Sequence, residues 1–182
     1  MGFKPTRRRG QYWDDAHALH EFLCGFPFHT TGRKEHDFET GFGTAMLASQ
    51  KQFKSQVITQ IDKTTTVQSV HCFGKKHRPD ITLDESGIAI EIKYITYDGL
   101  KEAIGQGFLY RMRYRFVFLV LVVSEERKVI YDDLHAAKEK DLEDSLSYLA
   151  GQLNIFTYIV PAFSLKPGVR KCFAFFEDAP TT

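Results

Sequence analysis

Two carboxylates and one ammonium group stand close together in this sequence, and groups of these types could hydrolyse a phosphodiester. Asp80 follows a proline, and ten residues separate it from Glu91, which stands two positions before Lys93. Neighbouring carboxylates repel each other and are costly to bury unless a cation is bound. Mg²⁺ is usually held by one or two carboxylates, with water and phosphate oxygens in its other positions. The residues therefore favour a Mg²⁺ or Mn²⁺ site at which Lys93 orients an attacking water or stabilises charge developing on a phosphate.

Two predicted strands must bring these groups together. Within residues 88–95, side chains alternate, so Glu91 and Lys93 share one face while Ile88, Ile90 and Ile92 share the other. The preceding strand begins at Pro79, where a missing N–H does least harm. Its apolar residues face the core and leave Asp80 on the opposite side. Antiparallel pairing of the two strands would then place Asp80 beside Glu91.

The rest of the chain predicts an α/β fold with a mixed sheet. Strands 64–73, 79–83 and 88–95 are expected to form an antiparallel meander, with turns at 74–78 and 84–87. A helix around residues 100–108 then leads to an apolar strand, 116–123, which indicates a parallel crossover. Further helices are expected at 14–25, 38–53 and 134–153, and further strands at 155–160 and 171–176.

Length and composition predict one domain in a reducing, cytoplasmic setting. The 182 residues are 43% hydrophobic and 26% charged, which is enough to bury one core. Flexible ends are expected only at a basic arm, residues 1–10, and a tail, residues 178–182. The three cysteines are far apart and odd in number, and neither a secretory signal nor a membrane span is expected. The three are Cys24, Cys72 and Cys172.

The net charge of +1 gives no global argument for a nucleic-acid partner, so local clusters of basic residues must carry that prediction. Two of the clusters flank the candidate site in the sequence, and for any one cluster a solvated surface is the alternative. The clusters are Lys4 with Arg7, Arg8 and Arg9; Lys75, Lys76 and Arg78; Arg111, Arg113 and Arg115; and Lys166, Arg170 and Lys171.

A known family has a similar arrangement of residues. The pair Pro79-Asp80, ten intervening residues and the tripeptide Glu91-Ile92-Lys93 resemble the signature of the PD-(D/E)xK nuclease superfamily. The resemblance implies a restriction-endonuclease-like core of helix, three-stranded meander, helix and strand, an order that the predicted elements follow over about half of the chain. It also implies a metal-dependent nuclease acting on DNA.

The resemblance implies further site residues. Asp80, Glu91 and the backbone carbonyl of Ile92 would hold the metal ion. In the family, an acidic residue on the helix before the meander often completes the site, and Glu39 is the first choice for it here, with Glu35 second. An ordinary solvent-facing glutamate is the alternative reading of both positions.

The helix after the second candidate strand carries a polar stripe. Gln106, Tyr110 and Arg113 fall at positions i, i+4 and i+7, opposite the apolar face. Gln106 and Tyr110 resemble the QxxxY element of the RecB-like exonuclease branch, which implies that they support the site and the DNA. Alternatively, the stripe is an exposed polar surface. The cysteines that hold an iron-sulfur cluster in parts of that branch have no counterpart here.

Other signals are weaker, and two rival readings remain. The tripeptide that begins at Glu126 also fits (D/E)xK but follows no proline-led strand, and His17 with His20 lacks a third zinc ligand at a recognisable spacing. One rival is a nuclease-like fold kept as a nucleic-acid-binding or assembly module without turnover. The other is an unrelated α/β domain with a chance motif. Endonuclease or exonuclease action and homo-oligomer formation are left open.

Overall fold

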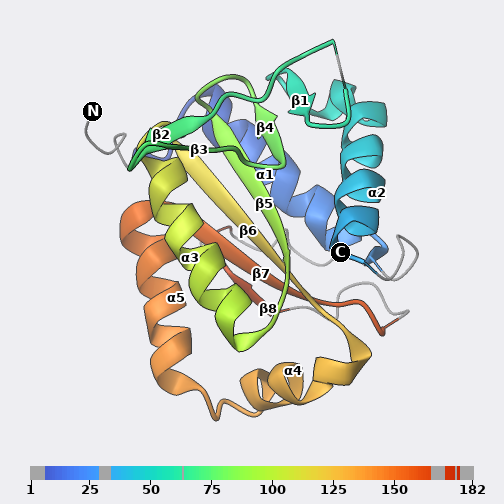
Figure 1. Cartoon of the computed structure of the whole chain (residues 1–182), viewed down its shortest axis with the longest axis vertical. Coiled ribbons are helices and arrows are strands. Elements are labelled where there is room, and N and C mark those ends of the chain that lie inside the picture. Colours follow the sequence, from blue (N-terminus) through green and yellow to red (C-terminus); the bar gives the residue numbers. More distant parts are fainter. Residues whose placement is uncertain (1–6, 29–33, 63, 165–170, 175, 177–182) are drawn as a thin grey trace.

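The computed structural model describes residues 7–28, 34–62, 64–164, 171–174 and 176. This part of the chain contains a mixed six-stranded sheet in the order β1-β4-β5-β6-β7-β8, flanked by helices on both faces (Figure 1). The strands are β1 Val57–Thr59, β2 Val70–Cys72, β3 Lys75–His77, β4 Ile81–Leu83, β5 Ile88–Tyr94, β6 Phe116–Val123, β7 Ile155–Pro161 and β8 Lys171–Phe173. The helices are α1 Gln11–Gly25, α2 Glu35–Ala48, α3 Tyr97–Arg111, α4 Lys128–His135 and α5 Lys140–Leu153, with short 3₁₀ helices at Gln50–Gln52 and Glu125–Arg127.

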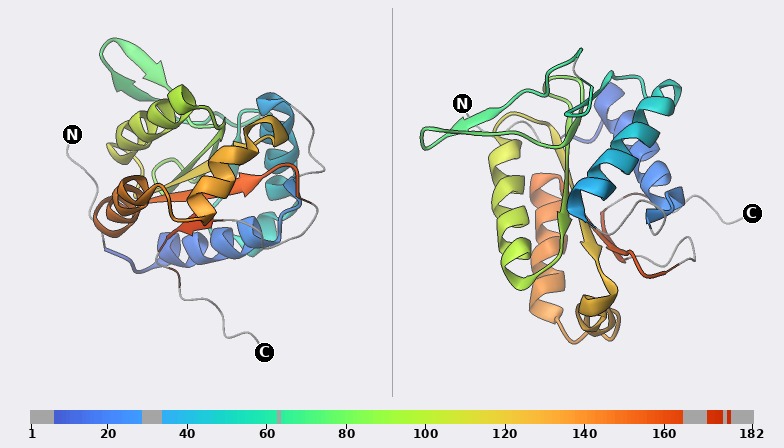
Figure 2. Two further views of the ribbon diagram at one scale, coloured as in Figure 1. Left: turned by 90° about the horizontal axis from the view of Figure 1, so that it is seen from below. Right: turned by 45° about the vertical axis from the view of Figure 1, so that its right-hand side comes forward.

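The predicted α/β class with a mixed sheet is confirmed. β1, β4 and β5 are antiparallel neighbours, whereas β5, β6 and β7 run parallel. β6 lies in the middle and is buried along its whole length. α1 and α2 pack on one face of the sheet, and α3 and α5 pack on the other (Figure 2). The crossover from β5 through α3 to β6 is the connection that the apolar pattern predicted.

The prediction of the first meander strand was wrong. The strand that pairs with β4 is β1, and the predicted strand 64–73 contains only the short β2. β2 forms a separate hairpin with β3, and β3 lies within the stretch 74–78 that was predicted as a turn. The β-branched threonines misled the prediction, because Thr64 donates from both its N–H and its hydroxyl to Asp62 Oδ1, at 2.8 and 2.6 Å. Such local bonds compete with a strand.

Helix boundaries also differ from the pattern. The helix predicted at 38–53 ends at Ala48, where a 3₁₀ turn follows, and the helix predicted at 134–153 is divided into α4 and α5. Ala137 lies between them with a φ of 53°, a left-handed conformation that no α-helix continues through. No helix in the described ranges is long and apolar enough to cross a membrane.

Two arginines from the predicted basic clusters are structural. Arg8 donates to the carbonyl of Ala150 at 2.7 Å, and the fully buried Arg111 donates to the carbonyls of Leu153 and Tyr114. The carbonyls at the end of a helix lack intrahelical partners and carry partial negative charge, so cations stabilise them. Both side chains therefore secure the end of α5. Of the predicted flexible ends, residues 1–6 and 178–182 lie outside the described residues.

Candidate active site at the open edge of strand β5

The site begins where β4 ends its pairing with β5. Ile81 pairs with Ile90, and the N–H of Asp80 donates to the Ile90 carbonyl at 3.1 Å, so Asp80 lies across from Glu91. Since β4 begins only at Ile81, the last residues of β5 have no strand partner on this side. An open edge is thus left beside the two carboxylates.

Carboxylates occupy this open edge in place of a strand. Asp80 Oδ2 accepts the N–H of Ile92 at 2.7 Å, and Glu35 Oε2 accepts the N–H of Tyr94 at 2.9 Å. Each residue of a β-strand directs its own N–H and its own C=O to the same side of the strand, and the next residue directs both groups to the other side. The Ile92 carbonyl is therefore directed to the edge at which Asp80 lies.

Glu91 and Lys93 lie together on the α3 face of β5. Glu91 is buried, with 2% of its surface exposed, and its Oε2 accepts the hydroxyl proton of Tyr110 at 3.0 Å. Lys93 Nζ lies 3.4 Å from Glu91 Oε1 and 3.1 Å from Glu35 Oε1. The ammonium thus bridges a carboxylate of the sheet and one from the start of α2.

Local sequence explains why α3 reaches Glu91. The helix begins after Thr96, whose hydroxyl accepts the N–H of Gly99 at 2.9 Å and so caps the first turn. At Gly107 the helix lies very close to the sheet, because a Cβ there would be 3.2 Å from Ile155 Cγ2 and 3.3 Å from Leu119 Cδ1. This close approach brings the Tyr110 hydroxyl within hydrogen-bond distance of the carboxylate on β5.

Burial and like charge govern the electrostatics of the site. Burial raises the pKa of Asp80 well above its usual value, and the nearby charge of Glu91 raises it further. Burial also raises the pKa of Glu91 to about 7, against the opposing effects of Lys93 and Tyr110. Burial lowers the pKa of Lys93, but Glu91 and Glu35 together outweigh it and raise that pKa. Two carboxylates that resist ionisation together are typical of a functional site.

The raised pKa of Glu91 predicts that the metal-free protein loses stability as the pH rises. The folded state holds a proton that the unfolded chain releases near pH 4.5, so stability falls from there to about pH 7. The loss expected from Glu91 alone is roughly 3 kcal/mol. Urea unfolding in chelator at pH 5 and pH 8 measures it. Glu91→Gln should flatten the dependence and the exposed Glu125→Gln should not; equal profiles for wild type and Glu91→Gln would contradict the prediction.

The two candidate acids of α2 have different places. Glu35, the second choice from the sequence, contacts Lys93 and the N–H of Tyr94 directly. Glu39, the first choice, raises the pKa values of both Asp80 and Glu91 by its charge. It lines a pocket of about 420 Å³ with Asp80, and His36 and Gln60 are also in the wall. The structure therefore brings both acids to the site.

The polar stripe of α3 is divided between the site and the opposite end of β5. The Tyr110 side chain is fully buried against Glu91. The Gln106 side-chain oxygen is buried and, among the described residues, has no hydrogen-bond partner. Arg113 instead donates to the carbonyl of Glu85, in the turn before β5. Among the predicted nucleic-acid contacts, Lys75, Lys76 and Arg78 are exposed on or just after β3.

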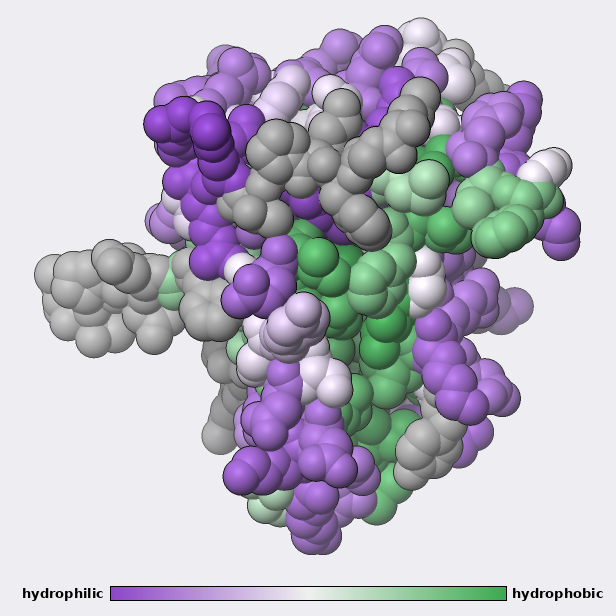
Figure 3. All heavy atoms as spheres, turned by 90° about the vertical axis from the view of Figure 1, so that its left-hand side faces the viewer, coloured by the Kyte–Doolittle hydropathy of each residue, from purple (hydrophilic) through white to green (hydrophobic). Residues whose placement is uncertain are grey.

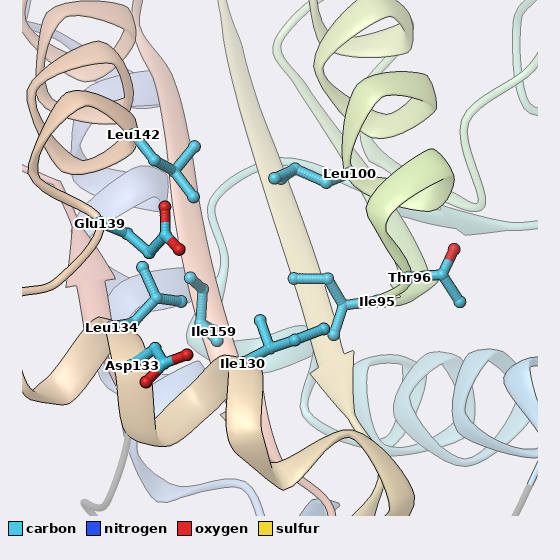
Figure 4. Close-up of a pocket in the computed structure, with 9 residues that line it drawn as sticks. All are labelled: Ile95, Thr96, Leu100, Ile130, Asp133, Leu134, Glu139, Leu142 and Ile159. Carbon is cyan, nitrogen blue, oxygen red and sulfur yellow. The ribbon is translucent and has the colours of Figure 1, made fainter.

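A second pocket, of about 170 Å³, lies between α3, α4 and α5 (Figure 4). Side chains including Ile95, Leu134 and Ile159 point into it, and on this side of the molecule a hydrophobic strip runs between hydrophilic ridges (Figure 3). Of its acidic residues, Asp133 is paired with Lys138 at 2.8 Å. Its lining is mainly apolar, so the coupled carboxylates of the open edge are the stronger candidate for chemistry.

Comparisons with protein-family models, curated proteins and solved structures gave no match. Among the residues that the structure describes, no three His, Cys, Asp or Glu side chains are grouped to hold a metal ion. The donors at the open edge are instead two carboxylates and a backbone carbonyl. One or two carboxylates are the share that proteins usually contribute to Mg²⁺, whose other ligands are water and phosphate oxygens. The residues therefore fit the ion that the sequence motif implies.

Proposed function

We propose that this chain is a metal-dependent nuclease of the PD-(D/E)xK type, with a restriction-endonuclease-like core, that hydrolyses phosphodiester bonds in DNA. The observation that best supports the proposal is a pair of carboxylates with raised pKa values, the half-buried Asp80 and the buried Glu91, beside the ammonium of Lys93. A cytoplasmic location is part of the proposal and fits three cysteines that are far apart in the sequence and odd in number.

Asp80, Glu91 and the Ile92 carbonyl would hold Mg²⁺ or Mn²⁺. When bound, such an ion supplies charge neutralisation at the phosphate and a lowered pKa for its water. The residues around it have supporting roles. The Ile92 N–H holds the Asp80 carboxylate, and the Tyr110 hydroxyl holds that of Glu91, so each carboxylate is fixed in orientation before any ion arrives.

Lys93 is the residue proposed to act on the substrate. Its ammonium is held between Glu91 and Glu35, and its raised pKa keeps it charged at neutral pH. From this position it orients the attacking water or stabilises negative charge on the phosphate oxygens. The charge of Glu39 acts on both Asp80 and Glu91. The Gln106 side-chain oxygen has no hydrogen-bond partner among the described residues and can accept a hydrogen bond from water.

Purified protein is the direct test. We expect it to cut DNA with Mg²⁺ or Mn²⁺ and to be inactive in chelator, and linear, circular and single-stranded substrates separate endonuclease from exonuclease action. At pH 8, Mg²⁺ should also raise the melting temperature of the wild type but not of Glu91→Gln, since a ligand stabilises the state that binds it. Wild-type protein that neither cuts DNA nor responds to Mg²⁺ would exclude the proposal.

One observation favours a second candidate, a nucleic-acid-binding module without turnover. The charged groups of the site already have internal partners, because Asp80 accepts from Ile92 and Lys93 is paired with two glutamates. Charged groups that have internal partners stabilise the fold, so they could be retained in a protein that has no catalytic activity. DNA binding without cleavage, under every metal condition, would select this reading.

A further inference from the structure

The β2–β3 hairpin extends beyond the body of the fold. Both views in Figure 2 show it projecting past α3, away from the central sheet. Its base is anchored, because Val70 is buried in the core on the α3 side and the Tyr114 hydroxyl donates to the carbonyl of Gln68 at 2.7 Å. The hairpin is therefore a fixed projection whose outer part faces solvent.

The tip of the hairpin carries an aromatic residue in an unfavourable place. Cys72 pairs with Lys75, so Phe73 and Gly74 form a two-residue loop, with φ values of 49° and 72°. Positive φ at both positions is typical of a type I′ turn, for which Asn-Gly is strongly preferred and a bulky residue is poorly suited. The Phe73 side chain is 98% exposed. Neither the turn nor the core explains a phenylalanine here.

The same hairpin carries positive charge that has no internal use. Residues 64–79 include no aspartate or glutamate. Lys75, Lys76 and Arg78 are exposed and, within the described part of the chain, take part in no ion pair. By contrast, Arg8 and Arg111 cap α5. Within the described residues, the hairpin is thus a basic cluster that is available to an anionic partner.

We propose that this hairpin binds the DNA substrate, with the Phe73 ring stacked on an unpaired base and Lys75 and Lys76 against phosphates. The inference rests on the proposed function for its choice of DNA. An exposed aromatic beside cations is the combination that binds single strands, because every base has a face on which an aromatic ring stacks. The substrate class is therefore DNA with an unpaired segment, such as a single strand or a frayed end.

The short segment between the hairpin and Asp80 supports the proposal that the hairpin and the carboxylates bind the same DNA molecule. Asp80 is seven positions after Phe73, and a fully extended chain over that separation spans at most roughly 25 Å. Stacked bases of one strand are about 3.4 Å apart. A strand bound at the carboxylates can therefore reach the hairpin within about seven nucleotides.

Binding in chelator tests the hairpin without cleavage. The change is Phe73→Asn, which suits the turn better than the native residue and so should not weaken the fold. Fluorescence anisotropy with a labelled single-stranded oligonucleotide should show binding about 5- to 150-fold weaker, the loss of one base stack. A fully paired, blunt duplex of the same sequence should show a smaller change. Phe73→Trp should retain binding, and Tyr148→Ala, at another exposed aromatic, should match the wild type.

The contribution of Lys75 and Lys76 is measured separately, from the salt dependence of DNA binding. Lys75→Ala and Lys76→Ala should each reduce the slope of log affinity against log salt by about 0.7, the value for one phosphate contact on a single strand. The exposed Lys140→Ala at the start of α5 is the matched control and should leave the slope unchanged.

Two results would overturn the inference. One is single-strand binding by Phe73→Asn that equals that of the wild type. The other is dependence on Phe73 for binding vesicles of phosphatidylserine and phosphatidylcholine but not DNA, which would assign the hairpin to a membrane surface. If the wild type binds DNA through Phe73 but never cuts it, only the nuclease proposal is excluded. If the wild type cuts DNA and its binding does not depend on Phe73, only the hairpin proposal is excluded.

Discussion

Lys93→Ala is expected to slow DNA cleavage by about 10²- to 10⁴-fold while DNA binding in chelator stays close to that of the wild type. The range is the usual loss when a group that assists proton transfer or stabilises charge in the transition state is removed. Lys93 is held by Glu91 and Glu35, and its side chain is mostly buried. A cation from solvent therefore does not replace its ammonium group in the alanine variant. Single-turnover cleavage at saturating protein separates this loss from any change in affinity.

Two further variants make the Lys93 test specific. Lys101→Ala removes the same charge from an exposed position on α3, where the side chain is 81% exposed, and should leave cleavage unchanged. Lys93→Met keeps the length of the side chain without its charge and should be as slow as the alanine variant. Cleavage by Lys93→Ala within a factor of ten of the wild type would refute the assigned role.

Arg111→Ala is expected to lower the free energy of unfolding by about 3 kcal/mol. The change leaves the buried carbonyls of Leu153 and Tyr114 without their donor, at about 1–3 kcal/mol each, and opens a cavity. Part of this cost is offset because the native guanidinium is itself desolvated, which lowers the pKa of Arg111 to about 10.

Urea unfolding measures this loss, and Arg127→Ala is the control. Arg127 is exposed on a 3₁₀ turn, so its replacement should change stability by less than about 0.5 kcal/mol. A loss below 1 kcal/mol for Arg111→Ala would show that water replaces the guanidinium at the end of α5.

The sequence predicted the two strands of the candidate site because the physical signal there is local. Alternation in β5 places Glu91 and Lys93 on one face, and the turn before it is short enough to fix an antiparallel register. Pro79 stands two residues before β4, which begins at Ile81. Asp80 opposite Glu91 follows from these features without knowledge of the rest of the fold.

Other parts of the site depend on contacts that no local pattern records. The choice between Glu35 and Glu39 depends on how α2 approaches the sheet, and Gly41 and Gly43 weaken the periodicity that would reveal its inward face. Tyr110 belongs to a stripe that also includes the distant Arg113, and only the close packing at Gly107 shows that its ring is buried. The hairpin tip was missed because Phe73-Gly74 lacks the usual residues of a tight turn.

The shortness of β4 has a consequence for self-association. A strand end without a neighbour can recruit a strand from another molecule and so begin aggregation. At the end of β5 the two N–H groups that such an intruder would need, those of Ile92 and Tyr94, are already bonded to carboxylates. The acidic groups proposed to prepare a site for DNA therefore also prevent the sheet from growing at this edge.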